Sequence, residues 1–451
     1  MAELNRSRLA ALLERERETF VERHPGSRER FAGAGAHLFG GVPMSWMLRW
    51  PGGFPIVVAD ASGARLTDVD GNRYVDLCLG DTGAMAGHGP EPTMRAIERQ
   101  AARGLATMLP GDDGPWVGAE LARRFGVERW QFTLTATDAN RFAIRIAREV
   151  TGRPRILIFN HCYHGTVDET LATLDASGRV VPRPGNVGPP VDPSVTTRVV
   201  EFNDEEALAA ELATGDVACV LAEPAMTNVG IVLPQPGFHD ALRRLTTGAG
   251  TLLVIDETHT FCAGPGGYTD AYGLTPDMVT IGKAIAGGVP AGALGMTAGL
   301  EARAMGRGDA DYVDTGGIGG TLAGNPLSLA AMRATLGEVL TYAAFAHTIP
   351  LAERFAAGVR DVVADARLPW HVTQLGCRAE YLFSAESPRT GSEAAAARDA
   401  LLEDYLHLAA LNRGVLLTPF HNMALMSPAT TEDDVDRHTE VFRETVAALV
   451  A

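Results

Sequence analysis

Cysteine is scarce in this sequence and is never paired at short spacing. The five cysteines are odd in number, widely spread and contain no Cys-x-x-Cys pair: Cys78, Cys162, Cys219, Cys262 and Cys377. This pattern argues against a disulfide framework and against a structural zinc site. We therefore expect a reducing, cytoplasmic location and no metal centre.

Long apolar runs are also lacking. No run approaches the roughly 18 residues that a membrane-spanning helix needs. The first twenty residues mix acidic and basic side chains without the apolar stretch of an export signal, so we expect a protein that is neither exported nor inserted in a membrane. Leu9, Leu12, Leu13 and Phe20 instead recur at helical spacing, which predicts an amphipathic helix ending near residues 24–27.

Positive charge is in deficit. The chain has 39 Lys and Arg against 55 Asp and Glu, a net charge of −16, so a basic face for nucleic acid is not expected. Gly and Pro, at 50 and 26 of 451 residues, fall below the level of disordered or collagen-like chains. A chain about three times the length of a typical domain of roughly 150 residues predicts one or two large domains.

Continuous apolar runs alternate with helical patterns through the middle of the chain. Strands are predicted at five places: 132–135, 156–159, 217–223, 251–256 and 278–282. This alternation is typical of a mostly parallel sheet covered by helices, so we predict an α/β fold. We expect a large domain over residues 61–330, starting with a hairpin that turns at 70–72, and a smaller α+β domain built from 1–60 and 331–451.

Two of the predicted strands end in residues suited to one kind of chemistry. Asp256 and Glu257 end the run TLLVID, and Lys283 follows MVTIG. A lysine amine forms a Schiff base with an aldehyde, and a carboxylate on a neighbouring strand keeps a pyridine nitrogen protonated. The combination indicates pyridoxal phosphate. Taken alone, however, Lys283 fits a solvated loop equally well.

Three other segments suit the same cofactor. Residues 135–138 end a strand and open a helix, whose free N–H groups favour a phosphate. Tyr163 follows the next strand, where its ring would stack on the cofactor, and Thr321 offers a hydroxyl in a Gly-rich stretch. Each segment also has a simpler explanation, which is a helix cap, ordinary packing or a turn.

Nine short strings, taken in order, resemble those of the class III (fold type I) pyridoxal-phosphate aminotransferases, which include the glutamate-1-semialdehyde aminomutases. The strings are GGV at 40–42, DVDGNRY at 68–74, GH at 87–88, TATDAN at 135–140, YHG at 163–165, EPAMTNVGIVLPQPGF at 223–238, DE at 256–257, GK at 282–283 and GTLAGNPL at 320–327. The resemblance runs from about residue 31 to the end and is nearest to the branch of β-amino-acid transaminases and aminomutases. It implies a seven-stranded sheet, pyridoxal 5'-phosphate as cofactor and a homodimer with shared active sites.

The resemblance also implies roles for single residues. Lys283 would form the Schiff base and move a proton, and Asp256 would pair with the pyridine nitrogen. Thr321 would reach the phosphate in the partner subunit. The full set of cofactor-binding residues that the resemblance implies is Ala136, Thr137, Tyr163, Glu223, Asp256, Lys283 and Thr321.

Three features depart from the family pattern: the phosphate-binding segment, one structural arginine and the substrate-binding residues. The family's Ser-Gly-Thr-Glu is replaced by Thr-Ala-Thr-Asp at 135–138, and the arginine that follows the aspartate strand is absent, with Cys262 near its place and His259 as a possible substitute. Arg49 is the nearby candidate for a substrate carboxylate, displaced by about two positions, and Phe420 stands where some β-amino-acid enzymes have another arginine. We predict substrate binding by Arg49, Trp46 and Phe420, in a pocket that Trp50 and Phe54 could make more aromatic, although each aromatic residue also suits a core.

Three functions follow from these observations. We expect an aminotransferase that moves an amino group from an amine or a β- or ω-amino acid to a keto acid or aldehyde. The alternative is a glutamate-1-semialdehyde-type aminomutase, which never releases the intermediate and needs no keto acid. A cofactor-binding protein with decayed catalysis is the remaining alternative, and the intact Lys283 and Asp256 argue against it.

Overall fold

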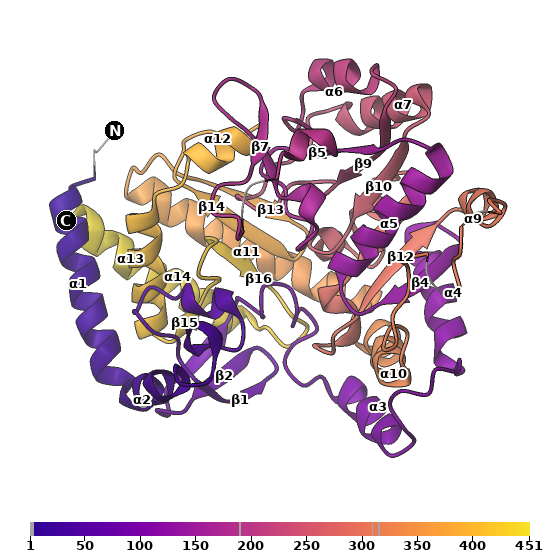
Figure 1. The fold of residues 1–451 in the computed structure, drawn as a ribbon. Helices are drawn as coiled ribbons and strands as arrows, with labels where there is room; N and C mark the ends of the chain where they lie inside the picture. Colours follow the sequence, from indigo (N-terminus) through magenta and orange to yellow (C-terminus); the bar gives the residue numbers. More distant parts are fainter. Residues whose placement is uncertain (1–3, 189–190, 309, 314–315) are drawn as a thin grey trace. The chain divides into compact units, whose positions relative to one another are not determined.

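The computed structural model of the chain describes residues 4–188, 191–308, 310–313 and 316–451 (Figure 1). It divides into two compact units. Unit 1 contains the described residues up to 90 together with 343–387 and 397–451, and unit 2 contains 91–342 and 388–396. This division differs from the boundaries expected from the sequence. Residues 61–90 fold with the terminal segments, and the second boundary falls at 342 instead of 330.

A seven-stranded sheet forms the centre of unit 2. Its order is β4-β12-β11-β10-β9-β5-β8, in which β12 runs antiparallel to both neighbours and the pairs from β11 to β8 are parallel. The strands are β4 (Arg129–Thr133), β5 (Arg155–Phe159), β8 (Thr197–Val200), β9 (Val217–Ala222), β10 (Leu252–Asp256), β11 (Met278–Ile281) and β12 (Gly292–Met296). The predicted mostly parallel α/β fold is confirmed. The apolar-run pattern did not predict β8 or β12, and β12 is glycine-rich.

Helices complete unit 2. Every residue of β9, β10 and β11 is buried, as expected for parallel strands covered on both faces, and so is every residue of the antiparallel β12. One helix, α5, runs along β9 to β12 (Figure 1). Its buried residues are mostly apolar. The helices are α3 (Glu91–Ala101), α4 (Asp113–Phe125), α5 (Ala136–Thr151), α6 (Glu205–Leu212), α7 (Phe238–Ala249), α8 (Gly267–Ala271), α9 (Ala298–Met305), α10 (Pro326–Ala334) and α12 (Gly391–Ala396), with a small hairpin of β6 (Ala172–Leu174) and β7 (Val180–Pro182).

Unit 1 combines two small sheets, of order β1-β2-β3-β15 and β13-β14-β16. The strands are β1 (Val58–Ser62), β2 (Arg65–Asp68), β3 (Arg73–Asp76), β13 (His371–Leu375), β14 (Arg378–Leu382), β15 (Val415–Leu416) and β16 (Met423–Leu425). The helices are α1 (Arg6–Arg23), α2 (Pro25–Ala34), α11 (Tyr342–Asp365), α13 (Ala400–Asn412) and α14 (Glu432–Val450). Among the described residues, no helix is both long and apolar enough to cross a bilayer.

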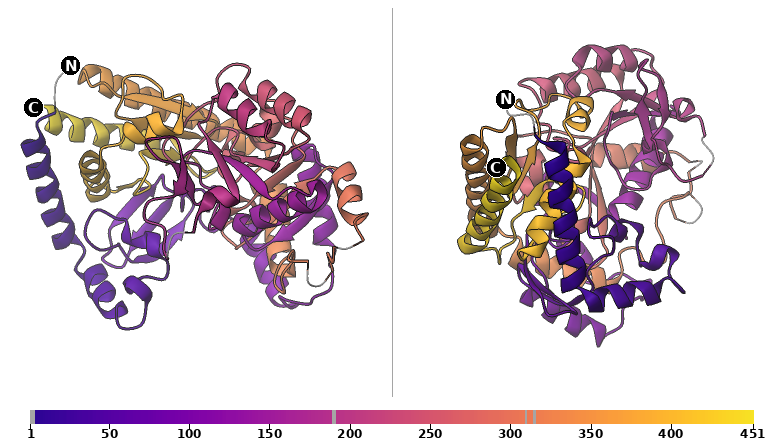
Figure 2. Two further views of the ribbon diagram at one scale, coloured as in Figure 1. Left: turned by 45° about the horizontal axis from the view of Figure 1, so that its top comes forward. Right: turned by 90° about the vertical axis from the view of Figure 1, so that its left-hand side faces the viewer.

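Helices from opposite ends of the sequence lie side by side in unit 1. The helix α1 packs along α13 and touches α14 (Figure 2). The Arg8 guanidinium donates to the Ala448 carbonyl oxygen from Nε at 2.8 Å and from Nη2 at 2.6 Å. The amphipathic helix predicted at the start of the chain is confirmed, and its buried side is the one that carries Leu9, Leu13 and Phe20.

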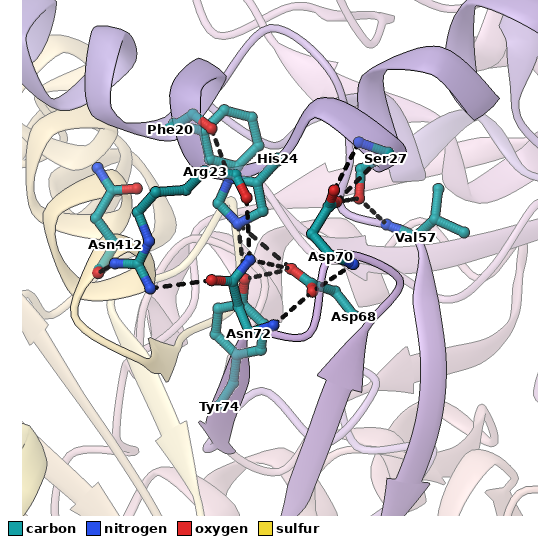
Figure 3. A network of polar contacts seen from close by, with 11 residues as sticks. Phe20, Arg23, His24, Ser27, Val57, Asp68, Asp70, Asn72, Tyr74 and Asn412 are labelled. Atoms are coloured by element: carbon teal, nitrogen blue, oxygen red, sulfur yellow. Dashed lines mark hydrogen bonds and ion pairs between the residues drawn. The ribbon is translucent and has the colours of Figure 1, made fainter.

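A buried polar network ties α1 and α2 to the β2–β3 hairpin (Figure 3). Asp68 accepts hydrogen bonds from the backbone N–H groups of Asp70, at 3.0 Å, and Asn72, at 2.8 Å. The Tyr74 hydroxyl donates to Asp68 at 2.7 Å and lies 2.8 Å from Nε2 of His24. The predicted hairpin is therefore confirmed, but it belongs to unit 1 and does not start the large domain.

Candidate active site

Lys283, Asp256 and the start of α5 meet at the carboxyl end of the unit 2 sheet. Asp256 is the last residue of β10 and pairs in register with Thr280 on β11, three residues before Lys283. Gly282 passes so close to α5 that a Cβ on it would lie 2.9 Å from the backbone nitrogen of Ala136. The strand ends thus bring together the predicted lysine, the predicted carboxylate and the helix start predicted to bind the phosphate, as expected for a ligand site in a parallel sheet.

The backbone holds Lys283 in an uncommon conformation. Its φ of 47° lies in the left-handed region, which side chains other than Gly seldom adopt. The lysine keeps partial exposure, whereas Gly282 before it and Ala284 after it are buried. Its Nζ atom lies 2.8 Å from Nε2 of His259. The amine is therefore accessible at the rim of the core and already has a hydrogen-bonding neighbour.

Asp256 is fixed by three donors. Its Oδ2 atom accepts from Nδ2 of Asn140 at 2.8 Å and lies 2.9 Å from Nδ1 of His164. Its Oδ1 atom accepts from the backbone N–H of Thr258 at 3.1 Å. The Asn140 amide oxygen in turn accepts from the Thr280 hydroxyl at 2.6 Å. The carboxylate is therefore buried in a single orientation. The Asn140 amide that binds it is fixed in turn by the Thr280 hydroxyl.

The buried pair Asp256 and His164 carries opposite charges. Burial would raise the pKa of Asp256, but the hydrogen bond and the charge of His164 outweigh it and lower that pKa. Burial would lower the pKa of His164, yet the nearby Cys162 sulfur and Asp256 carboxylate raise it to about 10. Asp256 is therefore ionised, as a partner for a protonated pyridine nitrogen must be.

The sequence analysis assigned no role to Asn140 or His164, although both lie within quoted strings, and it did not mention Thr280. Signals for Asn140 and Thr280 were present. Asn140 shares the buried face of α5 with Ala143, three residues on, and Thr280 interrupts the apolar run of β11. A polar residue at a core position needs a buried partner, which points to a network without naming its members.

The start of α5 lies against the segment that carries Tyr163. Thr135 caps the helix by accepting from the Asp138 N–H at 3.2 Å, so Ala136 and Thr137 supply N–H groups that have no partner within the helix. Gly165 has a φ of 81°, and a Cβ on it would lie 2.1 Å from the Thr137 hydroxyl oxygen. The tight contact brings the segment of Tyr163 to the helix N-terminus, where an anion is favoured.

Glu223 follows β9 and is buried beside the same cluster. Its two carboxylate oxygens accept from the Thr227 hydroxyl at 2.6 Å and from the Thr227 N–H at 3.2 Å. Burial raises the pKa of Glu223, while the charge of His164 opposes that rise and the charge of Asp256 adds to it. Glu223 therefore lies close enough to the Asp256–His164 pair to be coupled to both charges.

The loop after β10 is supported by two other buried charges. The Glu257 carboxylate accepts from the Thr260 hydroxyl at 2.6 Å and from the Thr269 N–H at 2.6 Å, which connects the loop to α8. The Arg124 guanidinium, on α4, donates to the Pro265 carbonyl oxygen at 2.9 Å. A buried arginine therefore supports this loop from a distant part of the sequence, although the loop itself lacks the arginine of the family pattern.

The residues at these strand ends fit pyridoxal 5'-phosphate. They offer an accessible amine for its aldehyde, a buried ionised carboxylate for its ring nitrogen and a helix N-terminus for its phosphate. The profile of the aminotransferase class-III family matches residues 47–446. The chain belongs to that family. It is a pyridoxal-phosphate-dependent enzyme of class III, as the resemblance predicted.

Similar proteins cover nearly the whole length of this class III enzyme. A glutamate-1-semialdehyde 2,1-aminomutase of Chloroflexus aggregans is 34% identical over 447 residues, which cover 95% of this chain and 99% of the relative. The crystal structure of a glutamate-1-semialdehyde aminomutase from Pseudomonas aeruginosa PAO1 has a TM-score of 0.96 and 50% identity and covers 99% of both chains. The same aminomutase is also known in complex with PMP. An omega-transaminase from Sphaerobacter thermophilus has a TM-score of 0.86 and 28% identity and covers 96% of this chain and 100% of that one.

Thr321 lies elsewhere in unit 2 of the class III enzyme. It is exposed and borders a surface hollow of about 780 Å³ that Arg129 and Met296 also line. Arg129 pairs with Met296, the last residue of β12. Lys283 lies two residues after Ile281, the β11 residue that pairs with Ala293 near the start of β12. Within one chain, Thr321 is therefore directed to a different part of the sheet from Lys283.

The three predicted substrate-binding residues cluster in unit 1. The rings of Trp46 and Phe420 meet edge to face at 5.9 Å, and the Arg49 guanidinium lies 5.5 Å from the Phe420 ring centre. Phe54 is not part of this cluster. It is 8% exposed, and its ring centre lies 4.8 Å from that of Phe20. Phe54 is therefore a core residue, which corrects the suggestion that it faces a pocket.

Proposed function

We propose that this class III enzyme is an aminomutase of the glutamate-1-semialdehyde type, which moves an amino group between adjacent carbons of one substrate. The observation that carries the proposal is the 50% identity to the Pseudomonas aeruginosa aminomutase over 99% of both chains. The curated relative from Chloroflexus aggregans has the same activity in its name. Both favour the aminomutase over the intermolecular aminotransferase that we expected first.

The proposed roles follow from the contacts at the strand ends. Pyridoxal phosphate, when bound, withdraws electrons from the substrate carbon that loses its proton. Lys283 would hold the cofactor aldehyde and would act as the base at that carbon, because its partly exposed amine follows the end of β11. Asp256, kept ionised by His164, binds the ring nitrogen, and Ala136 and Thr137 bind the phosphate through their N–H groups.

Two residues are proposed to complete the cofactor site. Tyr163 is partly exposed in the segment beside the start of α5, where its ring would cover one face of the pyridine. Glu223, whose pKa is raised by burial, would lie near the oxygen-bearing side of the ring. Thr321 would bind the phosphate in the partner subunit, which makes a homodimer the functional unit. This fits its exposed place away from Lys283 in the same chain.

The deciding experiment is turnover without an acceptor. The purified holoenzyme is incubated with glutamate 1-semialdehyde alone, and formation of the isomer that carries the amino group on C1 is followed by chromatography. We expect many turnovers per subunit in the absence of any keto acid. Turnover that stops after one equivalent and resumes when pyruvate or 2-oxoglutarate is added would reject the aminomutase.

An intermolecular aminotransferase is the second candidate. The observation that favours it is the aromatic cluster of Trp46 and Phe420 with Arg49 beside it, which suits an aryl-bearing amino acid. A panel of amine and β-amino-acid donors with pyruvate and 2-oxoglutarate, read by amination of the acceptor, tests this candidate directly.

The five buried thiols suit a reducing compartment, and we propose the cytoplasm as the location of either activity.

A further inference from the structure

His259 stands beside the amine that the proposed reaction uses. Its Nε2 atom lies 2.8 Å from Lys283 Nζ, which is hydrogen-bond distance. Both residues keep partial exposure in a part of the chain that is otherwise buried, including Asp256, Glu257, Thr258 and Thr260. The pair therefore lies in the accessible part of the site, at the atom that reacts.

Two fixed backbones hold this pair together. After β10, the buried Glu257 carboxylate binds the Thr260 hydroxyl and the Thr269 N–H, so the turn that carries the histidine is anchored on both sides. After β11, Lys283 has its φ of 47°, and Gly282 packs directly on the start of α5. The two side chains therefore start from fixed positions on neighbouring loops, and the 2.8 Å contact is within reach of both.

We propose that His259 is a second catalytic residue, which shares the proton that Lys283 carries between the two substrate carbons. The inference rests on the proposed function and adds a residue to its machinery. An Nζ–H bond of the neutral lysine donates to the Nε2 lone pair, and this leaves the Nζ lone pair to take the proton from the substrate carbon. The ammonium that forms shares one proton with Nε2. When Nζ delivers a proton to the next carbon, the imidazole returns its own, so no proton or electron is gained or lost over the cycle.

The side-chain type at position 259 matters for this role. Imidazole gains and loses a proton near neutral pH, so it can accept the extra proton of an ammonium group and return it. A glutamine amide at the same place would accept a hydrogen bond from the ammonium but could not take its proton. The exchange His259→Gln therefore removes proton sharing and keeps a polar side chain of similar reach.

The first measurement needs no substrate. Apoprotein of the full chain, as wild type and as His259→Gln, is mixed with pyridoxal 5'-phosphate, and the growth of the visible band of the lysine-bound cofactor is followed by stopped flow. We expect the variant to react at least about tenfold more slowly, because a glutamine amide cannot accept a proton from the amine that attacks the aldehyde. In steady state with glutamate 1-semialdehyde, we expect kcat to fall about 100-fold and KM to change less than about twofold.

His371→Gln is the matched control. His371 is also half-buried, lies on β13 in unit 1 and has Nδ1 2.9 Å from the Ser384 carbonyl oxygen. Its variant should keep both rates. His259→Ala is the second variant, and added imidazole should restore part of its cofactor uptake and turnover, because the free base replaces the missing side chain.

Three outcomes decide the matter. Wild-type rates in His259→Gln overturn the proposal, and so does a loss in His259→Ala that imidazole leaves unchanged. If the wild type does not isomerise glutamate 1-semialdehyde, the proposed function fails, but the rate of cofactor uptake still decides the role of His259. Slow uptake in both variants with rescue by imidazole supports the proposal in either case.

Discussion

Buried charges concentrate around one carboxylate, Asp256. It is 3% exposed, and a charge at that depth would be costly without partners. His164 supplies a compensating charge, and Asn140 supplies a neutral donor to the same oxygen. Glu223, next to them, has a pKa that burial raises, so it is less readily ionised. The pKa is thus lowered for Asp256 and raised for Glu223. Of these two carboxyl groups, Asp256 is the one that suits a cationic ring.

Replacing His164 by Gln should give a stability loss that depends on pH. The folded-state pKa of about 10 lies above the unfolded value of about 6.5, so the charge of His164 stabilises fully below about pH 6.5 and this stabilisation is lost as pH rises toward 10. Asp256 has a lowered pKa and stays ionised throughout this window. We expect a deficit of about 3 kcal/mol near pH 6, which shrinks as the pH approaches 10.

Thermal unfolding midpoints of wild type and His164→Gln, measured from pH 6 to 10, check this expectation. His161→Gln is the control, because burial lowers the pKa of His161, so its shift has the opposite sign to that of His164. A deficit of constant size across the range would mean that His164 acts by packing and not by charge.

Arg49 is predicted to bind a substrate carboxylate. A bidentate contact of this kind is charge-assisted, so Arg49→Ala should raise KM for carboxylate-bearing substrates about tenfold to 100-fold, while uncharged amines should be hardly affected. Steady-state kinetics with one substrate of each kind measure the difference. If Arg49 only stacks on Phe420, 5.5 Å away, both substrates should change in parallel.

At the scale of elements, the β2–β3 hairpin is an anchor for the N-terminal helices. Asp70 extends the network of Asp68 by accepting from the Gly26 N–H at 2.6 Å and the Ser27 N–H at 2.9 Å, both in α2 (Figure 3). A carboxylate that accepts hydrogen bonds from several N–H and O–H groups at once holds a turn and a helix start together. Two segments that would be loose by themselves are ordered together.

Asp68→Ala should destabilise unit 1. The change leaves the Tyr74 hydroxyl and two backbone N–H groups without their buried acceptor, so we expect a loss of about 3 kcal/mol or more. Thermal unfolding of the full chain and limited proteolysis near residue 24 measure it. Asp60→Ala, on the exposed part of β1, is the control and should change stability by less than about 0.5 kcal/mol. An equal effect of both changes would contradict the anchoring role.

At the scale of the whole molecule, the proposed homodimer determines whether the site is complete. Thr321 is exposed in its own chain, in a segment with the exposed apolar side chain of Leu322. In the proposed homodimer, the Thr321 hydroxyl would serve the Lys283 of the second chain.

Subunit mixing tests this arrangement. Lys283→Ala should lose the visible band and about 1,000-fold or more in turnover, since the base and the attachment point are both gone. Thr321→Ala should weaken cofactor binding by about 1–3 kcal/mol, because a hydrogen bond to a charged group is lost. Mixed dimers of Lys283→Ala with a Thr321 variant should recover part of the activity. No recovery in dimers whose composition has been verified by mass spectrometry would count against a shared site.

The sequence determined most elements and the family of this protein, and it predicted the main reacting groups. Apolar periodicity predicted α1, the hairpin at 70–72 and most strands of the central sheet, because burial needs the same spacing wherever an element is placed. Short strings at strand ends predicted Lys283, Asp256 and the class III family, since reactive groups there stand beside glycines and helix starts.

The tertiary structure decided which residues meet. Asn140 lies on α5, His164 in the segment after β5 and Thr280 on β11, and they join around Asp256 only when these parts of the chain are packed together. His259 reaches Lys283 because two loops are anchored side by side, and Arg124 supports one of those loops from a separate helix. No local pattern carries these contacts, because the partners are 24 to 141 positions apart in the sequence and only the fold brings them within hydrogen-bond distance.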